Sequence, residues 1–297
     1  FLAPTFLAEA PLMPVSAQTK AGLDDLRAEI LRLMQAFQPK RRSDLFRLPI
    51  DRVFTLRGHG TVVTGTMVSG HVDLGEDVVL YTKGTSTKVR GLQSHGETVE
   101  RAPAGRRTAV NLPGLEVADI ERGEVLARPG TLFPHLVWDA EIRCLSSSPR
   151  ALRHRTEVHF HHGSREVLAR LYLLDRDKLD PGQQAVCQIR FPEPMAGVFG
   201  DRFVVRAFSP LRTVAGGRCL NPLGRKVKRF SKDLERLAAL ASGDDETLIM
   251  TQLAMAGPEG VSYGQLRILT NLESKALETK LNELSGKQKL FLFDREE

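Results

Sequence analysis

The stretch that most constrains the fold is residues 49–80, where short β-branched segments alternate with glycines. Residues 53–56 and 61–64 have the composition of strands, and neither shows the three-to-four-residue spacing of a helical face. Glycine recurs every few residues, as it does where strands bend sharply or where two backbones approach closely. The stretch therefore predicts a small β-barrel rather than a helical or α/β layer.

Two motifs in this stretch carry a family resemblance. Pro-Ile-x-x-Val-Phe at residues 49–54 precedes Gly-x-Gly-Thr-Val-Val-Thr-Gly at residues 58–65. This succession resembles the second domain of translational GTPases of the elongation factor Tu class. Later strands, predicted at residues 105–112 and 120–127, follow the pattern of the same class. The resemblance implies a β-barrel over residues 45–129.

Length, charge and cysteine usage limit the number of domains, the kind of partner and the cellular compartment. The 297 residues suffice for two or three domains. A net charge of +6 modestly favours a polyanionic partner, although a surface with a slight excess of Lys and Arg explains it equally well. Three widely spaced cysteines indicate free thiols in a reducing compartment, so we expect a cytoplasmic protein. The sequence has no apolar run of about 18 residues, and we expect no membrane association.

The N-terminal segment predicts a strand, a loop and a helix. Residues 12–15 are a short apolar run typical of a buried strand end, and residues 23–37 carry apolar side chains on one helical face. Next to a Tu-like barrel, this order resembles the end of a GTPase domain, over residues 1–40. The resemblance implies that Ser16 and Ala17 hold the guanine base. The chain begins with Phe rather than Met, so we expect a fragment that lacks most of that domain.

The motifs that bind nucleotide phosphates are missing from the sequence. We find no GxxxxGK[ST] loop, no switch DxxG and no NKxD, and a nucleotide site needs phosphate-cradling amides, a lysine and a hydroxyl that holds Mg²⁺. In the intact protein the resemblance implies a GTPase that uses GTP and Mg²⁺. We expect this chain alone neither to bind GTP tightly nor to hydrolyse it.

A second β domain and a helical segment follow the first barrel. Alternating strands over residues 130–220 resemble the third domain of the same class, which is also a barrel. Helical periodicity then begins, with Ser262 as a predicted N-cap, and residues 290–293 read as a strand. Helices followed by a strand predict an α+β winged helix over residues 233–297. The predicted fold class is therefore mainly β, with two consecutive Tu-like barrels between a GTPase end and a winged helix.

The attached winged helix narrows the resemblance to the selenocysteine-specific elongation factors, the SelB family. The motifs Val-His-Phe-His-His-Gly and Arg-Thr-Val-Ala-Gly-Gly-Arg in the second barrel also resemble that family. The resemblance implies GTP-dependent delivery of selenocysteinyl-tRNA to the ribosome at recoded UGA codons, with this chain supplying the barrels that bind the aminoacyl-tRNA. It also implies that winged helices beyond this chain bind the selenocysteine-insertion mRNA hairpin, and we expect a monomer.

The family's aminoacyl pocket maps onto Asp51, Arg52 and Arg107, and no catalytic residue is assigned. A selenol is largely ionised near neutral pH, whereas serine and cysteine side chains are largely neutral, so always-charged guanidinium groups would favour the selenolate. The alternative is that both arginines are ordinary exposed barrel residues. His59 could contact the tRNA end or serve only in a turn. The histidines at 159, 161 and 162 lack a converging Cys or acid, so we expect no metal.

Two further functions remain open at this point. One is a non-catalytic regulator whose barrels and winged helix bind nucleic acid, although the mixed charges of the helix at residues 273–284 argue against it. The other is a Tu-class factor that carries ordinary aminoacyl-tRNA. Arginines at 202, 206, 212 and 218 could contact tRNA phosphates or simply keep the second barrel soluble.

Overall fold

The computed structural model describes residues 2, 5, 7–37, 43–56, 60–81 and 83–293. It separates into two compact units, residues 1–41 and residues 42–297. None of the helices in the described residues is both long and apolar enough to cross a membrane.

The described residues of the first unit form one helix, α1 (Leu23–Ala36), as the sequence predicted. Asp24 and Asp25 occupy its first turn, where acidic side chains offset the partial positive charge of the helix end. The prediction of a buried strand end at residues 12–15 is wrong, because no strand forms there and Leu12 is 78% exposed. A strand at residues 12–15 would need a neighbouring strand to satisfy its backbone N–H and C=O groups. The described residues of this unit contain no such neighbour.

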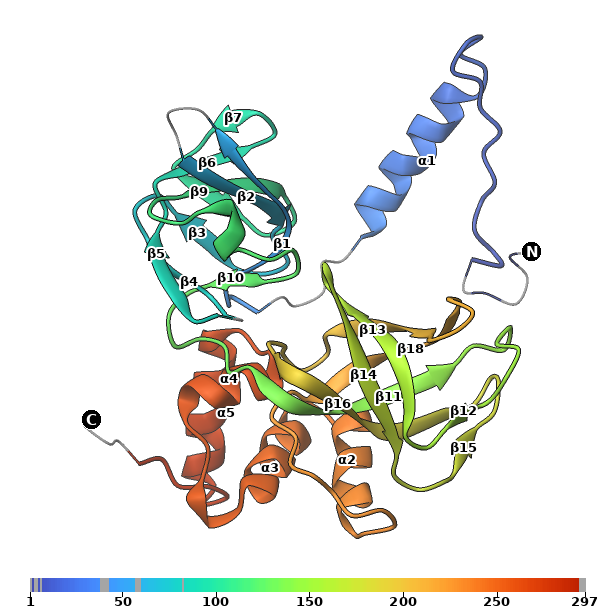
Figure 1. Ribbon diagram of the computed structural model, residues 1–297, viewed down its shortest axis with the longest axis vertical. Coiled ribbons are helices and arrows are strands. Elements are labelled where there is room, and N and C mark those ends of the chain that lie inside the picture. Colours follow the sequence, from blue (N-terminus) through green and yellow to red (C-terminus); the bar gives the residue numbers. More distant parts are fainter. Residues whose placement is uncertain are drawn as a thin grey trace. The chain divides into compact units, whose positions relative to one another are not determined.

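The second unit begins with a continuous antiparallel sheet over the predicted first barrel (Figure 1). Its strands pair in the order β5-β4-β10-β1-β2-β9-β6-β7, and β3 pairs with β8 beside them. A short 3-10 turn, η1 (Val117–Asp119), precedes the last strand. The strands are β1 (Arg47–Leu56), β2 (Gly60–Thr66), β3 (His71–Asp73), β4 (Asp77–Leu80), β5 (Thr85–Lys88), β6 (Gly91–Ser94), β7 (Glu97–Thr98), β8 (Arg101–Pro103), β9 (Arg107–Leu112) and β10 (Val125–Ala127).

Alternation of side chains explains why this sheet encloses a core. Nearly every strand contributes to one buried cluster, which includes Leu48, Val63, Leu80, Val110 and Leu126. Because successive strand residues point to opposite faces, one cluster shared by all these strands requires the sheet to curl around it. We call this body, residues 43–129, the first barrel.

The strand predicted across residues 87–93 is divided in the structure. Strand β5 pairs with β4, whereas β6 pairs with β9, so the chain changes partners between them. The Val89 N–H donates to the carbonyl oxygen of Glu76, and the Arg90 N–H donates to that of Asn111. The two residues therefore bridge one pairing to the next instead of continuing a single strand.

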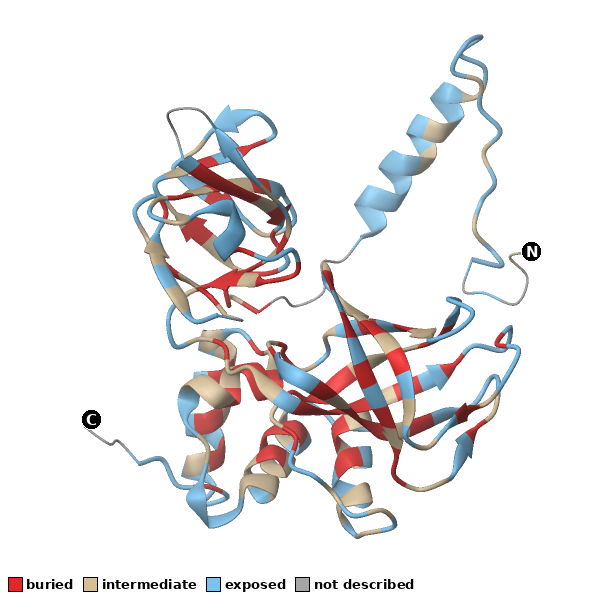
Figure 2. Ribbon diagram, in the orientation of Figure 1, coloured by how far each residue is buried: buried red, intermediate tan, exposed pale blue. Residues whose placement is uncertain are grey.

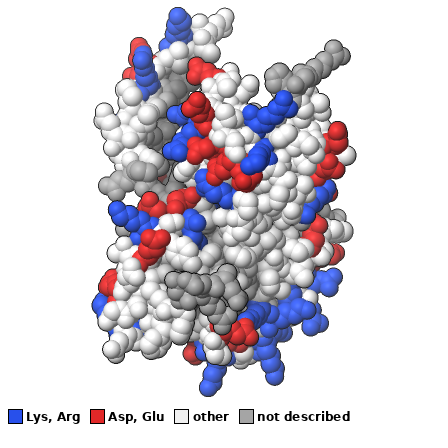
Figure 3. Space-filling view, turned by 90° about the vertical axis from the view of Figure 1, so that its left-hand side faces the viewer, with Lys and Arg blue, Asp and Glu red and all other residues white. Residues whose placement is uncertain are grey.

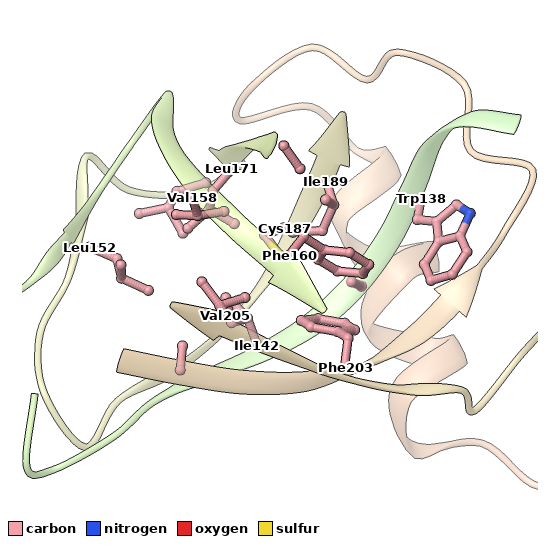
Figure 4. Close-up of a cluster of buried hydrophobic side chains, with 14 of the residues drawn as sticks. Trp138, Ile142, Leu152, Val158, Phe160, Leu171, Cys187, Ile189, Phe203 and Val205 are labelled. Atoms are coloured by element: carbon pink, nitrogen blue, oxygen red, sulfur yellow. The ribbon is translucent and has the colours of Figure 1, made fainter. Parts of the chain in front are cut away.

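The second predicted barrel is confirmed as a closed barrel of six strands, in the order β11-β16-β14-β13-β17-β18. Its core gathers Trp138, Phe160, Phe191 and Phe203 with aliphatic side chains from the surrounding strands (Figure 4). We call residues 130–221 the second barrel. Its strands are β11 (His135–Cys144), β12 (Leu152–Arg153), β13 (Thr156–His162), β14 (Arg165–Leu173), β15 (Lys178–Leu179), β16 (Gln184–Met195), β17 (Arg202–Ala207) and β18 (Thr213–Asn221), of which β12 and β15 form a separate pair.

Four α-helices follow, and residues 233–286 that contain them are called the helical module. They are α2 (Asp233–Ser242), α3 (Asp245–Ala256), α4 (Tyr263–Thr270) and α5 (Ser274–Gly286), with the 3-10 turn η2 (Gly257–Glu259) between the second and third. Ser262 caps α4 in a reciprocal capping box with Gln265, as predicted. The strand predicted at residues 290–293 is wrong, because these residues pair with no other described segment.

The helical module packs against both barrels. Leu237 and Leu240 of α2 are buried with Leu220 of β18, and Ile268 of α4 is buried with Leu45 ahead of β1. Figure 2 shows buried positions on one side of α2 and of α3, with exposed positions on their other sides. The two barrels and the helices thus share buried surface within this unit.

Candidate functional site

The candidate site lies on β1, where a β-bulge interrupts the pairing with β2. Ile50 is opposite Gly65 and Arg52 is opposite Thr64, so Asp51 is an extra residue in β1. A β-bulge changes the direction of the side chain it carries. Gly65 permits the irregularity, because a Cβ atom there would lie 2.1 Å from the carbonyl oxygen of Pro49.

The bulge brings Asp51 into a two-pronged ion pair with Arg107 at the start of β9. The Arg107 Nη1 donates to Oδ2 of Asp51 at 2.5 Å, and Nη2 donates to Oδ1 at 2.8 Å. Thr64 joins the pair from β2: its hydroxyl accepts from Nη2 of Arg107 at 3.1 Å and donates to Oδ1 of Asp51 at 3.0 Å. Three neighbouring strands therefore contribute one side chain each to a single hydrogen-bonded group.

The electrostatics of this group follow from its contacts. The Arg107 guanidinium lowers the pKa of the Asp51 carboxyl, and the Thr64 hydroxyl and the charge of Arg52 add to that effect against the cost of burial. The same pairing raises the pKa of Arg107. Both groups remain charged near neutral pH, and their charges offset each other.

Arg52 occupies the exposed side of β1, and no carboxylate among the described residues forms an ion pair with it. The group of Asp51, Arg52 and Arg107 therefore carries one net positive charge, which resides on Arg52. Arg107 still has unused N–H groups, because its contacts to Asp51 and Thr64 involve only three of its five. The arrangement can hold an anion beside a fixed, planar donor.

The structure thus brings all three predicted pocket residues to one region of the first barrel, and it adds one that the sequence analysis missed. Thr64 was read only as part of a strand. Its hydroxyl and its position directly before Gly65 were the only sequence features that could have pointed to a role in the site. The strand register that places Thr64 against Asp51 is visible only in the fold. Gly58 and His59 lie outside the described residues.

Comparison with known proteins adds independent information. Residues 60–127 match the family model described as elongation factor Tu domain 2. Residues 139–226 match the model for the β-barrel domain of the selenocysteine-specific elongation factor. A selenocysteine-specific elongation factor of Desulfomicrobium baculatum is 61% identical over 297 residues, which is 100% of this chain. The chain belongs to the SelB family of selenocysteine-specific elongation factors.

Other members of the SelB family match at lower identity. The selenocysteine-specific elongation factor of Escherichia coli K12 is 33% identical over 80% of the chain. A crystal structure of bacterial EF-Sec matches the fold with a TM-score of 0.72 at 23% identity, over 95% of this chain and 49% of that one. The apo form of SelB from Methanococcus maripaludis has a TM-score of 0.62 at 26% identity, over 75% and 51% of the two chains. The chain spans 47% and 37% of the two curated relatives.

In this SelB-family chain, Ser16 and Ala17 lie in a turn ahead of α1. The Ser16 N–H donates to the carbonyl oxygen of Ala21 at 3.0 Å, and the Ser16 hydroxyl accepts from the Thr19 N–H at 3.2 Å. Among the described residues, the Ala17 N–H has no hydrogen-bond partner. The turn therefore leaves the Ala17 N–H available as a donor.

Two histidines of the second barrel, His159 and His162, contact carboxylates. His159 contacts Glu166 at 2.7 Å and stacks on Phe208, and no group of three or more potential ligands converges within the described part of the chain. Of the arginines proposed for phosphates, Arg218 is held by Glu141 at 2.8 Å and donates to the backbone of α2. The face drawn in Figure 3 mixes acidic and basic side chains over much of its area. That face is not a continuous basic surface.

The three cysteines, Cys144, Cys187 and Cys219, are free and buried, as the sequence indicated. Burial raises the pKa of Cys187 and Cys219 well above the usual value of a thiol. They serve as core side chains rather than nucleophiles.

Proposed function

We propose that the intact protein is a GTP-dependent factor that delivers selenocysteinyl-tRNA to the ribosome at recoded UGA codons. Membership of the SelB family supports this function over an ordinary aminoacyl-tRNA carrier or a nucleic-acid-binding regulator. The observation that carries the proposal is the pairing of Asp51 with Arg107 beside an unpaired Arg52 on a Tu-like barrel. This chain contributes the surface that holds the aminoacyl end of the tRNA.

The pocket selects selenocysteine by charge. Asp51 and Thr64 fix the Arg107 guanidinium in one orientation, so a side chain that enters meets donors already in place. Arg52 supplies the uncompensated positive charge. A selenolate gains a charge-assisted hydrogen bond from such a pocket, whereas a neutral serine hydroxyl gains less. Because Arg107 is already paired, we assign the net attraction to Arg52 and the orientation to Arg107.

Membership of the Tu class implies that the intact protein binds GTP and Mg²⁺. The residues of this chain fit only part of that ligand set. Ser16 and Ala17 form a turn with a free backbone donor, which suits a guanine base. No phosphate-binding loop is present in the sequence, so the residues in hand do not fit the phosphates or the metal. We propose that the rest of the GTPase domain supplies that part of the site.

The chain is proposed to divide at residues 1–40, 45–129, 130–220 and 233–297. The first segment ends a GTPase domain, and the outward apolar side chains of α1, such as Met34 at 66% exposure, are consistent with a missing neighbour. The helical module corresponds to the first of a series of winged helices, with further ones binding the mRNA hairpin. A cytoplasmic location fits the buried free thiols.

The proposal is tested with the full-length factor loaded with GTP. Dissociation constants are measured for selenocysteinyl-tRNA and for the same tRNA carrying serine, with wild type and the Arg52→Ala and Arg107→Ala variants. We expect each substitution to weaken the selenocysteinyl complex by roughly tenfold to a hundredfold, the range for a charged hydrogen bond, and the seryl complex by much less.

The matched control is Arg90→Ala, another arginine of the first barrel that lies outside the group around Asp51. It should leave both complexes unchanged. Equal losses for the two tRNAs in the Arg52 and Arg107 variants would remove these residues from amino-acid selection.

A further inference from the structure

The turn between β13 and β14 of the second barrel lies against β1 of the first barrel. His162 pairs with Arg165, so Gly163 and Ser164 form a two-residue hairpin turn. A Cβ atom on Gly163 would lie 3.3 Å from the Cβ atom of Pro49, which is closer than most such contacts. Gly163 also has a positive φ of 56°, which favours glycine. The turn therefore reaches β1 as closely as a glycine backbone allows.

The contact falls on the residue that precedes the bulge. The carbonyl oxygen of Ile50 accepts a hydrogen bond from the Ser164 hydroxyl at 2.7 Å and another from the Gly123 N–H at 2.8 Å. The Ile50 N–H donates to the carbonyl oxygen of Glu124 at 2.8 Å. Both backbone polar groups of Ile50 are thus bonded to segments other than β2. The next peptide carries Asp51, whose side chain reaches Arg107.

We propose that Ser164 is a positioning residue for the aminoacyl pocket. Its hydroxyl holds the Ile50 carbonyl and thereby fixes the bulge that directs Asp51 toward Arg107. The pocket lies entirely on the first barrel, yet one of its supports comes from the second. Selectivity for the aminoacyl group consequently depends on how the two barrels meet.

Other contacts hold the barrels together without Ser164. Arg47 of β1 donates to Asp201 of the second barrel at 2.7 Å, and His162, also of the second barrel, contacts that carboxylate from its own side at 3.1 Å. Gly123 packs against the backbone of Arg165, where a Cβ atom would lie 2.6 Å from its Cα atom. Loss of the Ser164 hydroxyl should therefore leave the barrels associated, so its effect is expected at the bulge.

The first test needs no tRNA and uses this chain. The guanidinium NMR signals of Arg107 and the titration of the Asp51 carboxyl are compared between wild type, Ser164→Ala and Ser164→Thr, with Asp51→Asn as the reference for a broken pair. In Ser164→Ala we expect the Arg107 signals to move toward those of Asp51→Asn and the Asp51 midpoint to rise. Ser164→Thr retains the hydroxyl and should restore both signals.

Ser148→Ala is the matched control, because Ser148 also donates its hydroxyl to a backbone carbonyl, that of Arg150, at 2.8 Å in the second barrel. It should leave the Arg107 and Asp51 signals unchanged. Unaltered signals in Ser164→Ala, with the fold intact by circular dichroism, overturn the positioning role.

The second test rests on the proposed function and uses the full-length factor. Ser164→Ala should reduce the preference for selenocysteinyl-tRNA over seryl-tRNA by about three- to tenfold, the range for one neutral hydrogen bond, and Ser164→Thr should restore it. If the NMR signals change but the preference does not, Ser164 positions Asp51 and the pocket assignment fails. The positioning role of Ser164 and the pocket assignment can thus fail independently of each other.

Discussion

The Asp44 carboxylate caps helix α5 at Ser274, which lies 230 residues further along the chain. It accepts the Ser274 N–H at 3.2 Å and the Ser274 hydroxyl at 2.6 Å. Arg267 of α4 donates to the same carboxylate at 2.7 Å. The local N-cap residue, Glu273, makes no side-chain cap of its own. A residue of the first barrel, just ahead of β1, therefore supplies the cap that the helical module lacks.

Replacement of Asp44 by Ala should destabilise the second unit by about 1–2 kcal/mol, as expected for a lost cap and a partly exposed ion pair. Although burial opposes the effect, the hydrogen bonds from Ser274 and Arg267 lower the pKa of Asp44. A carboxyl with a lowered pKa contributes stability that is present at neutral pH and lost in acid. The difference in unfolding free energy between wild type and variant, measured in urea, should therefore shrink below about pH 4.

Glu259→Ala is the control for Asp44→Ala, because Glu259 forms a surface pair with Arg225 in which the side chains are 79% and 71% exposed. The Glu259→Ala variant should lose less than about 0.5 kcal/mol of unfolding free energy. A comparable loss in both variants would contradict the capping role of Asp44.

Gly65→Ala should disrupt the bulge, because the new Cβ atom would overlap the Pro49 carbonyl oxygen. We expect a loss of roughly 1–3 kcal/mol, typical of forced overpacking, together with loss of the Arg107 guanidinium signals that report the pair with Asp51. Gly91→Ala is the comparison, because its Cβ atom would meet nothing closer than 3.6 Å. Similar behaviour of the two variants would show that close approach at Gly65 does not shape the bulge.

Asp139 should make the stability of the second unit depend on pH near neutrality. Burial raises the pKa of Asp139 to about 7, against the hydrogen bonds from Gln188 and Asn221. The folded state then holds a proton that the unfolded state releases at lower pH, so this group's contribution falls as pH rises from about 4 to 7. Urea unfolding at several pH values should show that slope in wild type and a weaker slope in Asp139→Asn. Equal slopes in wild type and Asp139→Asn would contradict a raised pKa of Asp139.

Local patterns predicted most strands of both barrels and the helices. Alternating residues such as those at 157–162 specify a strand regardless of its neighbours, and Ser262 with Gln265 specifies a helix start. The strands predicted at residues 12–15 and 290–293 do not form, because apolar composition alone does not provide a neighbouring strand for pairing. The strand across residues 87–93 was divided for a related reason, since its partner changes midway.

The candidate site was accessible from sequence only through the family resemblance. Asp51 and Arg107 are 56 residues apart, and nothing in their local sequence indicates that they meet. The bulge that joins them depends on Gly65 and on the Ser164 turn of another barrel. Contacts of this kind arise from tertiary packing, so composition and periodicity do not reveal them.

The most direct test of the central claim is the pH dependence of aminoacyl discrimination by the full-length factor. Dissociation constants are measured for one tRNA carrying selenocysteine, cysteine or serine, from neutral pH down through the ionisation of the selenol. Asp51 stays charged in this range because its pKa is lowered by Arg107. Selenocysteinyl-tRNA should bind most tightly at neutral pH and lose that advantage as the selenol is protonated, while seryl-tRNA binding stays constant. Equal affinities at neutral pH, or a preference that does not change with pH, would contradict selection of a selenolate by Arg52 and Arg107.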